Sequence, residues 1–318
     1  MGDRRVPLLT ASISEETRGY LTASKAARTI RAYRCDVSDF EAWCHAHVRA
    51  PFPATPETIA DYISAQADLG RSAATITRRL SAISQVHQMA GLESPTRSQL
   101  VRMTASGIRR SLGVAPRQAR PILVAELRSM IELLPHDLRG LRDRALLLVG
   151  FAAGMRRSEL VGLNVEDVIE EPGGLGVTIR RSKTDQEGQG RVVGIVRGSR
   201  GPLTDPVAAV REWRKAAGID AGPLFRKVDR GERVGPRRLS DLAVTRIVKK
   251  AATTIGIDPN LVSGHSLRSG LATSASAAGA PERAIMNTTG HRSTAMVRRY
   301  IRQGSKFVDS ASRYLLAL

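Results

Sequence analysis

The chain has 318 residues, enough for about two domains with a sizeable core. Lysine and arginine number 49 against 30 aspartate and glutamate, and the net charge of +19 favours a polyanionic partner such as DNA or RNA. Aromatic residues are only 4% of the chain, which argues against single-strand binding by base stacking. A GC-rich genome also favours arginine codons, but a surplus of this size must still occupy some surface.

Residue usage argues against disulfide-bonded, membrane-spanning, metal-binding and dinucleotide-binding proteins. Cys35 and Cys44 are nine residues apart, which places them on opposite faces of a helix, so they cannot pair. Without a disulfide framework or an apolar leader, we expect a cytoplasmic protein, and no apolar run is long enough for a membrane span. No residue spacing suggests a metal site, and no phosphate-binding loop or dinucleotide motif is present. We therefore expect neither metal nor cofactor.

The N-terminal third predicts a bundle of about four short helices. After a basic lead, apolar residues repeat at helical spacing over residues 26–48, 56–67, 72–90 and 96–108. Thr55 and Ser72 are the expected N-caps of the second and third helices. We predict a helical domain over residues 8–112.

Three arginines of this bundle have two possible roles. Arg71, Arg78 and Arg79 lie in or near one predicted helix. They either face a phosphate backbone or belong to an ordinary solvated surface, and the sequence does not decide between these.

Residues 113–121 predict a linker, because they are rich in proline and arginine and poor in large apolar residues. The region 122–318 then predicts a mixed α+β domain. Two strands, 177–180 and 192–195, flank a polar glycine-bearing turn at 185–190, which indicates a hairpin with a long tip. The expected helices are 125–134, 140–153, 205–217, 239–255, 265–279, 281–289, 293–302 and 305–317. The fold class is mainly α with a small β-hairpin or sheet.

Five side chains in this second region form a spaced pattern. Arg156 lies at the start of a helix, with Glu159 one turn later to orient it. His265 and Arg268 are three residues apart, and Gly290-His291 precedes a tyrosine by nine residues; the full set is Arg156, His265, Arg268, His291 and Tyr300. Arginines neutralise phosphate charge, histidines move protons, and a tyrosine oxygen can form a covalent phosphate ester. Each element alone is weak evidence, but together they indicate metal-free attack on a phosphodiester.

The chain resembles the tyrosine recombinases (phage integrase family) of the small Cre/Xer-like kind. Gly-Met-Arg-Arg-Ser-Glu-Leu at 154–160 resembles the first arginine box, and Gly-His-Ser-Leu-Arg-Ser-Gly at 264–270 resembles the His-x-x-Arg box. Gly-His-Arg-Ser at 290–293, followed by Arg-Tyr-Ile at 299–301, resembles the final histidine and the nucleophile. The resemblance implies a SAM-like core-binding helical bundle and a catalytic domain of the tyrosine recombinase type.

The resemblance also implies a role for each matching residue. Tyr300 resembles the nucleophile that forms a 3′-phosphotyrosyl bond, and His265 resembles its proton acceptor. Arg156 and Arg268 resemble the phosphate clamp, supported by Glu159, and His291 resembles the residue that hydrogen-bonds a phosphate oxygen.

Three assignments stay open at this level. Lys183 resembles the hairpin lysine that protonates the leaving 5′ oxygen, but Arg180 and Arg181 crowd it. Arg157 adjoins Arg156, and only the Gly-x-Arg spacing favours Arg156. Tyr314 is a second C-terminal tyrosine, without the Gly-His spacing.

The resemblance implies a site-specific DNA recombinase that clamps double-stranded DNA at a target site and exchanges strands without metal or ATP. We expect a monomer or weak oligomer when free and a homotetramer on paired sites, near the nucleoid. The last predicted helix carries an apolar stripe over residues 306–318. This stripe is expected to dock either on a neighbouring subunit or on its own domain. The alternatives are a type IB topoisomerase-like nicking-closing enzyme and a DNA-binding protein without catalysis.

Overall fold

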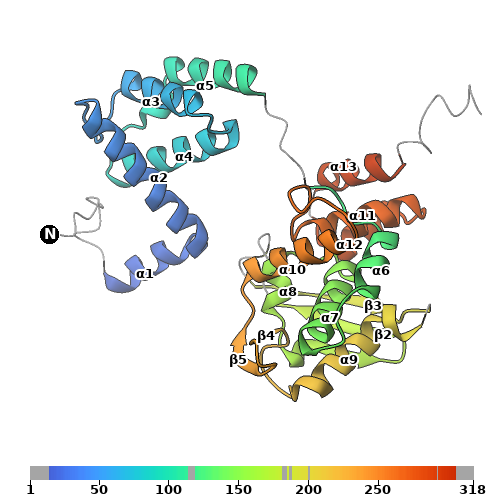
Figure 1. Cartoon of the computed structure of the whole chain (residues 1–318). Coiled ribbons are helices and arrows are strands. Elements are labelled where there is room, and N and C mark those ends of the chain that lie inside the picture. Colours follow the sequence, from blue (N-terminus) through green and yellow to red (C-terminus); the bar gives the residue numbers. More distant parts are fainter. Residues whose placement is uncertain are drawn as a thin grey trace, which may run out of the picture. The chain divides into compact units, whose positions relative to one another are not determined.

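The computed structural model describes residues 14–113, 119–180, 185, 188–199, 201–291 and 293–305. The chain forms two compact units, Met1–Arg117 and Gln118–Leu318 (Figure 1). The fold is mostly helical with small antiparallel sheets, as the sequence predicts. Within the described residues, no helix is long and apolar enough to cross a membrane.

The N-terminal unit is built only from helices in its described part. They are α1 (Glu15–Ala23), α2 (Ala27–Ala46), α3 (Pro56–Asp68), α4 (Ala73–Met89), the 3-10 turn η2 (Pro95–Arg97) and α5 (Gln99–Leu112). Helix α1 is an addition to the predicted set. Thr55 and Ser72 are N-caps as expected, since their side chains accept from the backbone N–H of Thr58 and Thr75. Phe40, Tyr62 and Ile83 are fully buried and anchor the core.

One of the three arginines considered for phosphate binding is structural. Arg79 is 6% exposed, and its guanidinium donates to the Tyr62 hydroxyl and to the Asp39 carboxylate. Arg78 pairs with the buried Asp36 at 3.0 Å. The prediction that Arg79 either faces DNA or lies on a solvated face is therefore wrong. Both arginines lie on α4 and their partners Asp36 and Asp39 lie on α2, so these ion pairs connect the two helices.

The C-terminal unit combines helices with two small sheets. Its elements are α6 (Val124–Glu132), α7 (Leu138–Ala152), α8 (Arg157–Gly162), η3 (Val165–Asp167), β1 (Val168–Glu171), β2 (Gly174–Ile179), β3 (Arg191–Val196), η4 (Pro202–Thr204), α9 (Pro206–Ala217), β4 (Arg226–Val228), β5 (Val234–Arg238), α10 (Asp241–Thr254), α11 (Ser266–Ala277), α12 (Glu282–Thr289) and α13 (Thr294–Ser305).

The predicted hairpin is two strands of a three-stranded antiparallel sheet, in the order β1-β2-β3. Val177 of β2 pairs with Val168 of β1 and Val193 of β3. Strand β1 was not predicted, because only Val168 of its four residues is buried and two are glutamates. The hairpin β4–β5 was also missed, since its arginine-rich strands lack an apolar alternation.

Helix α7 is the central element that positions the site. Residues 145–151 are all buried, as their apolar sequence predicts. Gly150 lets α8 and α11 approach closely, because a Cβ there would lie 2.8 Å from Leu160 and 3.2 Å from Leu267. Gly154 ends the turn after α7 with φ of 56°. Arg156 and Arg268 therefore enter the same region from two helices that pack on α7.

Candidate active site

Arg156 is held by a buried carboxylate. It immediately precedes α8, and its Nη1 donates to Glu159 Oε1 at 2.5 Å, while its backbone N–H donates to Glu159 Oε2 at 3.0 Å. The Glu159 side chain is 0% exposed, and that of Arg156 is 18% exposed. One carboxylate thus fixes the backbone and the guanidinium of the same arginine, while the Arg156 side chain stays partly exposed.

The adjacent arginine has a different partner. Arg157 Nη1 donates to Thr245 Oγ1 on α10 at 2.8 Å. The aliphatic part of Arg157 also packs where a Cβ at Gly264 would lie, 2.2 Å from Arg157 Cδ. The geometry therefore distinguishes the two arginines in favour of Arg156.

Arg268 is a buried arginine with unused donors. It is 1% exposed, and its Nη1 donates to the carbonyl of Gly154 at 2.7 Å and to the carbonyl of Thr289. Its Nε and Nη2 are buried and have no hydrogen-bond partner within the described protein. Burying unsatisfied donors on a cation is costly, so this arrangement suits an anion that accepts from both nitrogens.

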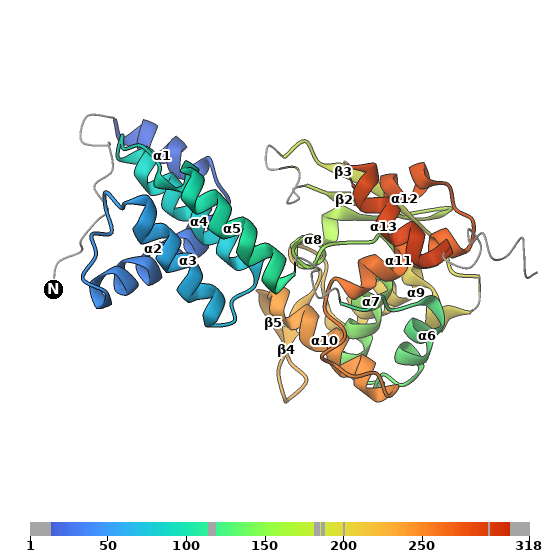
Figure 2. The ribbon, with the colours of Figure 1, turned by 90° about the horizontal axis from the view of Figure 1, so that it is seen from above.

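His265 and Tyr300 are in direct contact. His265 Nε2 lies 2.9 Å from the Tyr300 hydroxyl oxygen, although the two residues are 35 positions apart in the chain. His265 precedes α11 and Tyr300 lies on α13, and these two helices run side by side in both views (Figures 1 and 2). Tyr300 is 8% exposed. An unprotonated Nε2 in this position can accept the phenolic proton.

His291 is a second histidine near the tyrosine. Its ring centroid is 5.8 Å from that of Tyr300, and its Nδ1 is 2.6 Å from Thr289 Oγ1. The Thr289 hydroxyl donates its single proton to the carbonyl of Ile285 at 2.6 Å. It must therefore accept from Nδ1–H of His291, which leaves Nε2 of a neutral His291 as an acceptor. His291 can donate from Nε2 only when it is protonated.

The cluster is strongly cationic, and this shifts its titrating groups. Desolvation of the imidazole and the charges of Arg268 and Arg156 lower the pKa of His265 from 6.5 to about 4, although the residue as a whole is exposed to solvent. Burial and the same two arginines lower the pKa of His291 to about 3. Burial, followed by Arg156, lowers the pKa of Arg268 to about 10. A bound anion would oppose all of these shifts.

One further arginine reaches this cluster, and it was not among the predicted site residues. Arg191, the first residue of β3, donates to the carbonyls of Thr288 at 2.8 Å and Thr289 at 3.4 Å. Its Nη2 is also 3.7 Å from Glu159 Oε2. An arginine at the start of a strand carries no distinctive sequence signal, so only its contacts reveal it.

The structure thus brings together five of the six predicted site residues: Arg156, His265, Arg268, His291 and Tyr300. Glu159 supports Arg156 as the sequence indicates. Lys183, the sixth residue, and the competing Tyr314 lie outside the described residues. Across the described ranges, no group of three or more His, Cys, Asp or Glu side chains could hold a metal ion.

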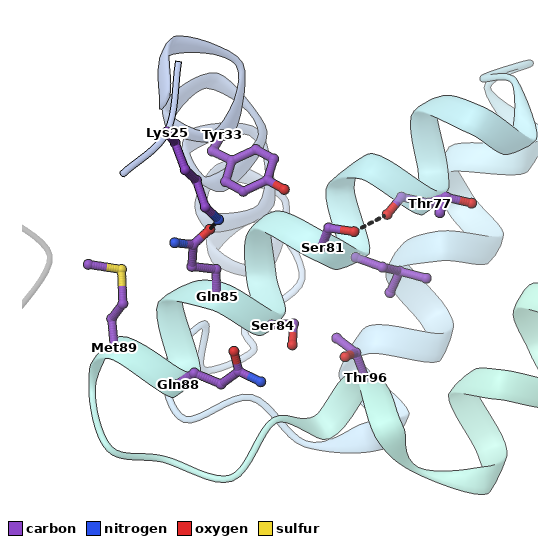
Figure 3. Close-up of a pocket in the computed structure, with 10 residues that line it drawn as sticks. Lys25, Tyr33, Thr77, Ser81, Ser84, Gln85, Gln88, Met89 and Thr96 are labelled. Carbon is purple, nitrogen blue, oxygen red and sulfur yellow. Dashed lines mark hydrogen bonds between the residues drawn. The ribbon is translucent and has the colours of Figure 1, made fainter. Parts of the chain in front are cut away.

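The N-terminal unit carries a polar groove of about 550 Å³ between α2 and α4 (Figure 3). Figure 3 shows Ser81, Ser84, Gln85 and Gln88 on α4 along this groove. Lys25 donates to the Gln85 side chain, and its Nζ lies 5.0 Å from the Tyr33 ring centroid. These groups donate and accept hydrogen bonds, but no titrating pair among them suggests catalysis.

Comparison with known proteins agrees with this geometry. The family model "Phage integrase family" matches residues 122–306, and "Phage integrase, N-terminal SAM-like domain" matches residues 19–94. An "Integrase/recombinase xerD homolog" of Selenomonas ruminantium is 41% identical over 303 residues, which are 94% of this chain and 88% of the relative. "Recombinase cre" of Escherichia phage P1 is 27% identical over 281 residues, covering 82% of this chain and 80% of the relative.

Two solved structures have the same fold. XerH site-specific recombinase in a post-cleavage complex with palindromic difH substrate has a TM-score of 0.61 at 18% identity, covering 82% of this chain and 72% of that one. A lambda integrase dimer bound to a COC′ core site has a TM-score of 0.56 at 18% identity, covering 95% and 93%.

The chain belongs to the phage integrase family. It is a tyrosine-type site-specific recombinase, an enzyme that breaks and rejoins DNA strands. The relatives do not favour the nicking-closing or the binding-only alternative.

Proposed function

We propose that Tyr300 attacks a phosphodiester of double-stranded DNA and forms a 3′-phosphotyrosyl intermediate. A free 5′ hydroxyl of a second strand then attacks this intermediate and displaces the tyrosine. The phosphotyrosyl bond retains the energy of the phosphodiester, so neither ATP nor another cofactor is needed. The proposal is carried by the 2.9 Å contact between the Tyr300 hydroxyl and His265 Nε2.

His265 is the proposed proton acceptor in the first step. Its lowered pKa keeps the imidazole neutral at physiological pH, so that Nε2 can accept the phenolic proton. When the scissile phosphate enters, its negative charge offsets the arginines and raises the basicity of His265. The base thereby becomes stronger in the complex in which it is needed.

Arg156 and Arg268 are proposed to hold the phosphate and to stabilise the charge that develops on its oxygens. The partly exposed side chain of Arg156 and the unpartnered Nε and Nη2 of Arg268 support this assignment. These cations replace the role that a metal ion plays in many phosphoryl transfers. Adduct formation is therefore expected to continue in the presence of a chelator.

His291 is the proposed donor to a phosphate oxygen. Because Thr289 occupies Nδ1, this requires His291 to take up a proton as the phosphate binds. Lys183 is the proposed general acid that protonates the leaving 5′ oxygen. That role needs a cationic donor near the strand break, and the hairpin that contains Lys183 adjoins α12 through Arg191.

The proposed partner is duplex DNA carrying a specific target sequence, in keeping with the net charge of +19. We assign residues 8–112 to core DNA binding, 113–121 to a linker and 122–318 to catalysis and subunit linkage. The polar groove on α4 supplies hydrogen-bonding groups of the kind that read base edges. We further propose a weakly associating free protein that assembles as a tetramer on paired sites, in the cytoplasm at the nucleoid.

The test is covalent trapping. The protein is incubated with DNA containing its selected binding site, denatured in SDS, and examined for a protein–DNA adduct. Tyr300→Phe, which removes a single oxygen, should abolish the adduct while leaving folding and DNA affinity nearly unchanged. Tyr314→Phe is the matched control and should form the adduct normally. The reverse pattern would show that the nucleophile is assigned to the wrong tyrosine.

A further inference from the structure

Arg191 forms an unusual set of contacts at the C-terminal end of α12. Its Nη1 donates to the carbonyls of Asn287 at 3.3 Å and Thr288 at 2.8 Å, and its Nη2 donates to that of Thr289 at 3.4 Å. The last carbonyls of a helix have no partners within the helix, and its dipole favours a cation at this end. Arg191 therefore caps α12 from a neighbouring strand, and Figure 2 shows β3 beside α12.

The same guanidinium connects both phosphate-clamp arginines. The carbonyl of Thr289 that accepts from Arg191 also accepts from Arg268. The Glu159 carboxylate, which lies 3.7 Å from Arg191, also holds Arg156. Arg191 thus shares one partner with each of the two arginines.

Gly290 packs closely against the Arg191 side chain. A Cβ at Gly290 would lie 2.7 Å from Nε and 2.9 Å from Cζ of Arg191, and the glycine has φ of 66°. Only glycine combines this backbone conformation with this close packing. Because His291 follows directly, the position of Arg191 also determines where the His291 backbone begins.

Arg191 is turned toward the protein rather than toward a ligand. Its side chain is 22% exposed, and both terminal nitrogens are engaged by carbonyls or by Glu159. Burial lowers its pKa, with Glu159 acting in the opposite direction. A residue arranged in this way acts through its neighbours.

We propose that Arg191 is a positioning residue, which aligns Arg156, Arg268 and His291 by holding Glu159 and the last carbonyls of α12. The inference rests on the proposed function, since it concerns the alignment of that same site. A displacement of about 1 Å in a catalytic group can cost about 10²-fold in rate. Loss of Arg191 should therefore affect the chemical step more than DNA binding.

The experiment compares Arg191→Met, Arg191→Lys and wild type by single-turnover cleavage, DNA affinity and thermal unfolding. Rates are measured at a temperature at which unfolding curves show each variant to be folded. We expect Arg191→Met to cleave about 10–100-fold more slowly, with DNA affinity changed less than about threefold. Arg191→Lys, which restores the charge but only a single donor group, should recover part of the rate.

Arg197→Met is the matched control. Arg197 follows β3, is 43% exposed and pairs with Glu170 outside the cluster. This variant should cleave at nearly the wild-type rate. It reports any effect of removing a positive charge from the same sheet edge.

Gly290→Ala gives a second perturbation of the same contact. It should slow cleavage, and the double variant Gly290→Ala with Arg191→Lys should lose less than the product of the two single effects, because both act through one contact.

Two results would overturn the inference. A folded Arg191→Met protein that cleaves at the wild-type rate would reduce Arg191 to a purely structural role. A loss of DNA affinity as large as the loss of rate would mean that Arg191 binds DNA directly. Both are distinct from failure of the proposed function, in which wild type itself forms no adduct.

Discussion

Replacing Arg268 with methionine should separate the proposed catalytic role of this side chain from its contribution to folding. Methionine has a similar length and no charge. The variant loses the donation from Nη1 to the carbonyls of Gly154 and Thr289. Each charge-assisted hydrogen bond contributes about 1.5–3 kcal/mol, so about 3–6 kcal/mol of stabilisation is removed.

The same substitution also stabilises the fold by a similar amount, because two buried donors of Arg268 have no hydrogen-bond partner. The substitution removes the unpartnered Nε and Nη2, each of which costs about 1–3 kcal/mol, or about 2–6 kcal/mol together. The pKa of Arg268 leads to a similar figure, since its lowering to about 10 corresponds to about 3 kcal/mol against the charged form in the folded state. The two ranges largely offset each other, so the free energy of unfolding should fall by no more than about 4 kcal/mol. Cleavage should slow by about 10³–10⁵-fold.

Arg142→Met is the matched control. Arg142 is 7% exposed, and its guanidinium is satisfied by Asp143 at 2.7 Å and by the carbonyl of Arg226. Its removal takes away the ion-pair partner of the half-buried Asp143, although Lys250 still acts on that carboxylate, so we expect a loss of about 1–3 kcal/mol in stability. Cleavage per folded molecule should stay near the wild-type rate.

Urea unfolding followed by circular dichroism measures the stability of each variant, and a time course of the covalent adduct measures cleavage. The reasoning about Arg268 fails if Arg268→Met loses more than about 4 kcal/mol of stability, since its buried donors would then be structural. It also fails if the folded variant cleaves at nearly the wild-type rate.

Three further predictions concern the proton donor, the DNA contact and acid stability. Lys183→Ala should be slow on normal DNA and largely rescued when sulfur replaces the 5′-bridging oxygen, because sulfur leaves without a proton; equal defects on both substrates would assign the proton donor elsewhere. The logarithm of DNA affinity should fall linearly with the logarithm of salt concentration, by about 0.9 per phosphate neutralised, and a slope near zero would contradict extensive phosphate contact. The folded-state pKa values of His265 and His291, about 4 and about 3, lie below the ordinary 6.5, so the unfolded chain binds more protons below that pH. Urea unfolding should accordingly show stability falling as pH drops from about 6.5 toward about 4, less steeply in His265→Gln and His291→Gln. Stability that rises on acidification would be inconsistent with arginines beside these two histidines.

Much of the helical architecture and the site follows from local sequence patterns. Apolar spacing and the caps at Thr55 and Ser72 are short-range signals, and they are confirmed. The strands β1, β4 and β5 escaped prediction because their residues are polar, and their pairing depends on partners elsewhere in the chain.

The choice between neighbouring arginines required the tertiary structure. Arg156 and Arg157 are equivalent in composition, and only the contacts with Glu159 and Thr245 separate them. Arg79 was considered for DNA because a sequence does not reveal that Tyr62 and Asp39 lie beside it.

The sequence by itself determined the family and the helical class and predicted the chemical groups of the site, because residue type and spacing along one chain carry that information. Only the tertiary structure decided the tautomer imposed on His291, the unpartnered donors of Arg268 and the contacts of Arg191. These features arise where α11, α12 and β3 meet, between residues as much as 98 positions apart. Hydrogen bonds over such separations depend on atomic positions to within a few tenths of an ångström, which no local pattern encodes.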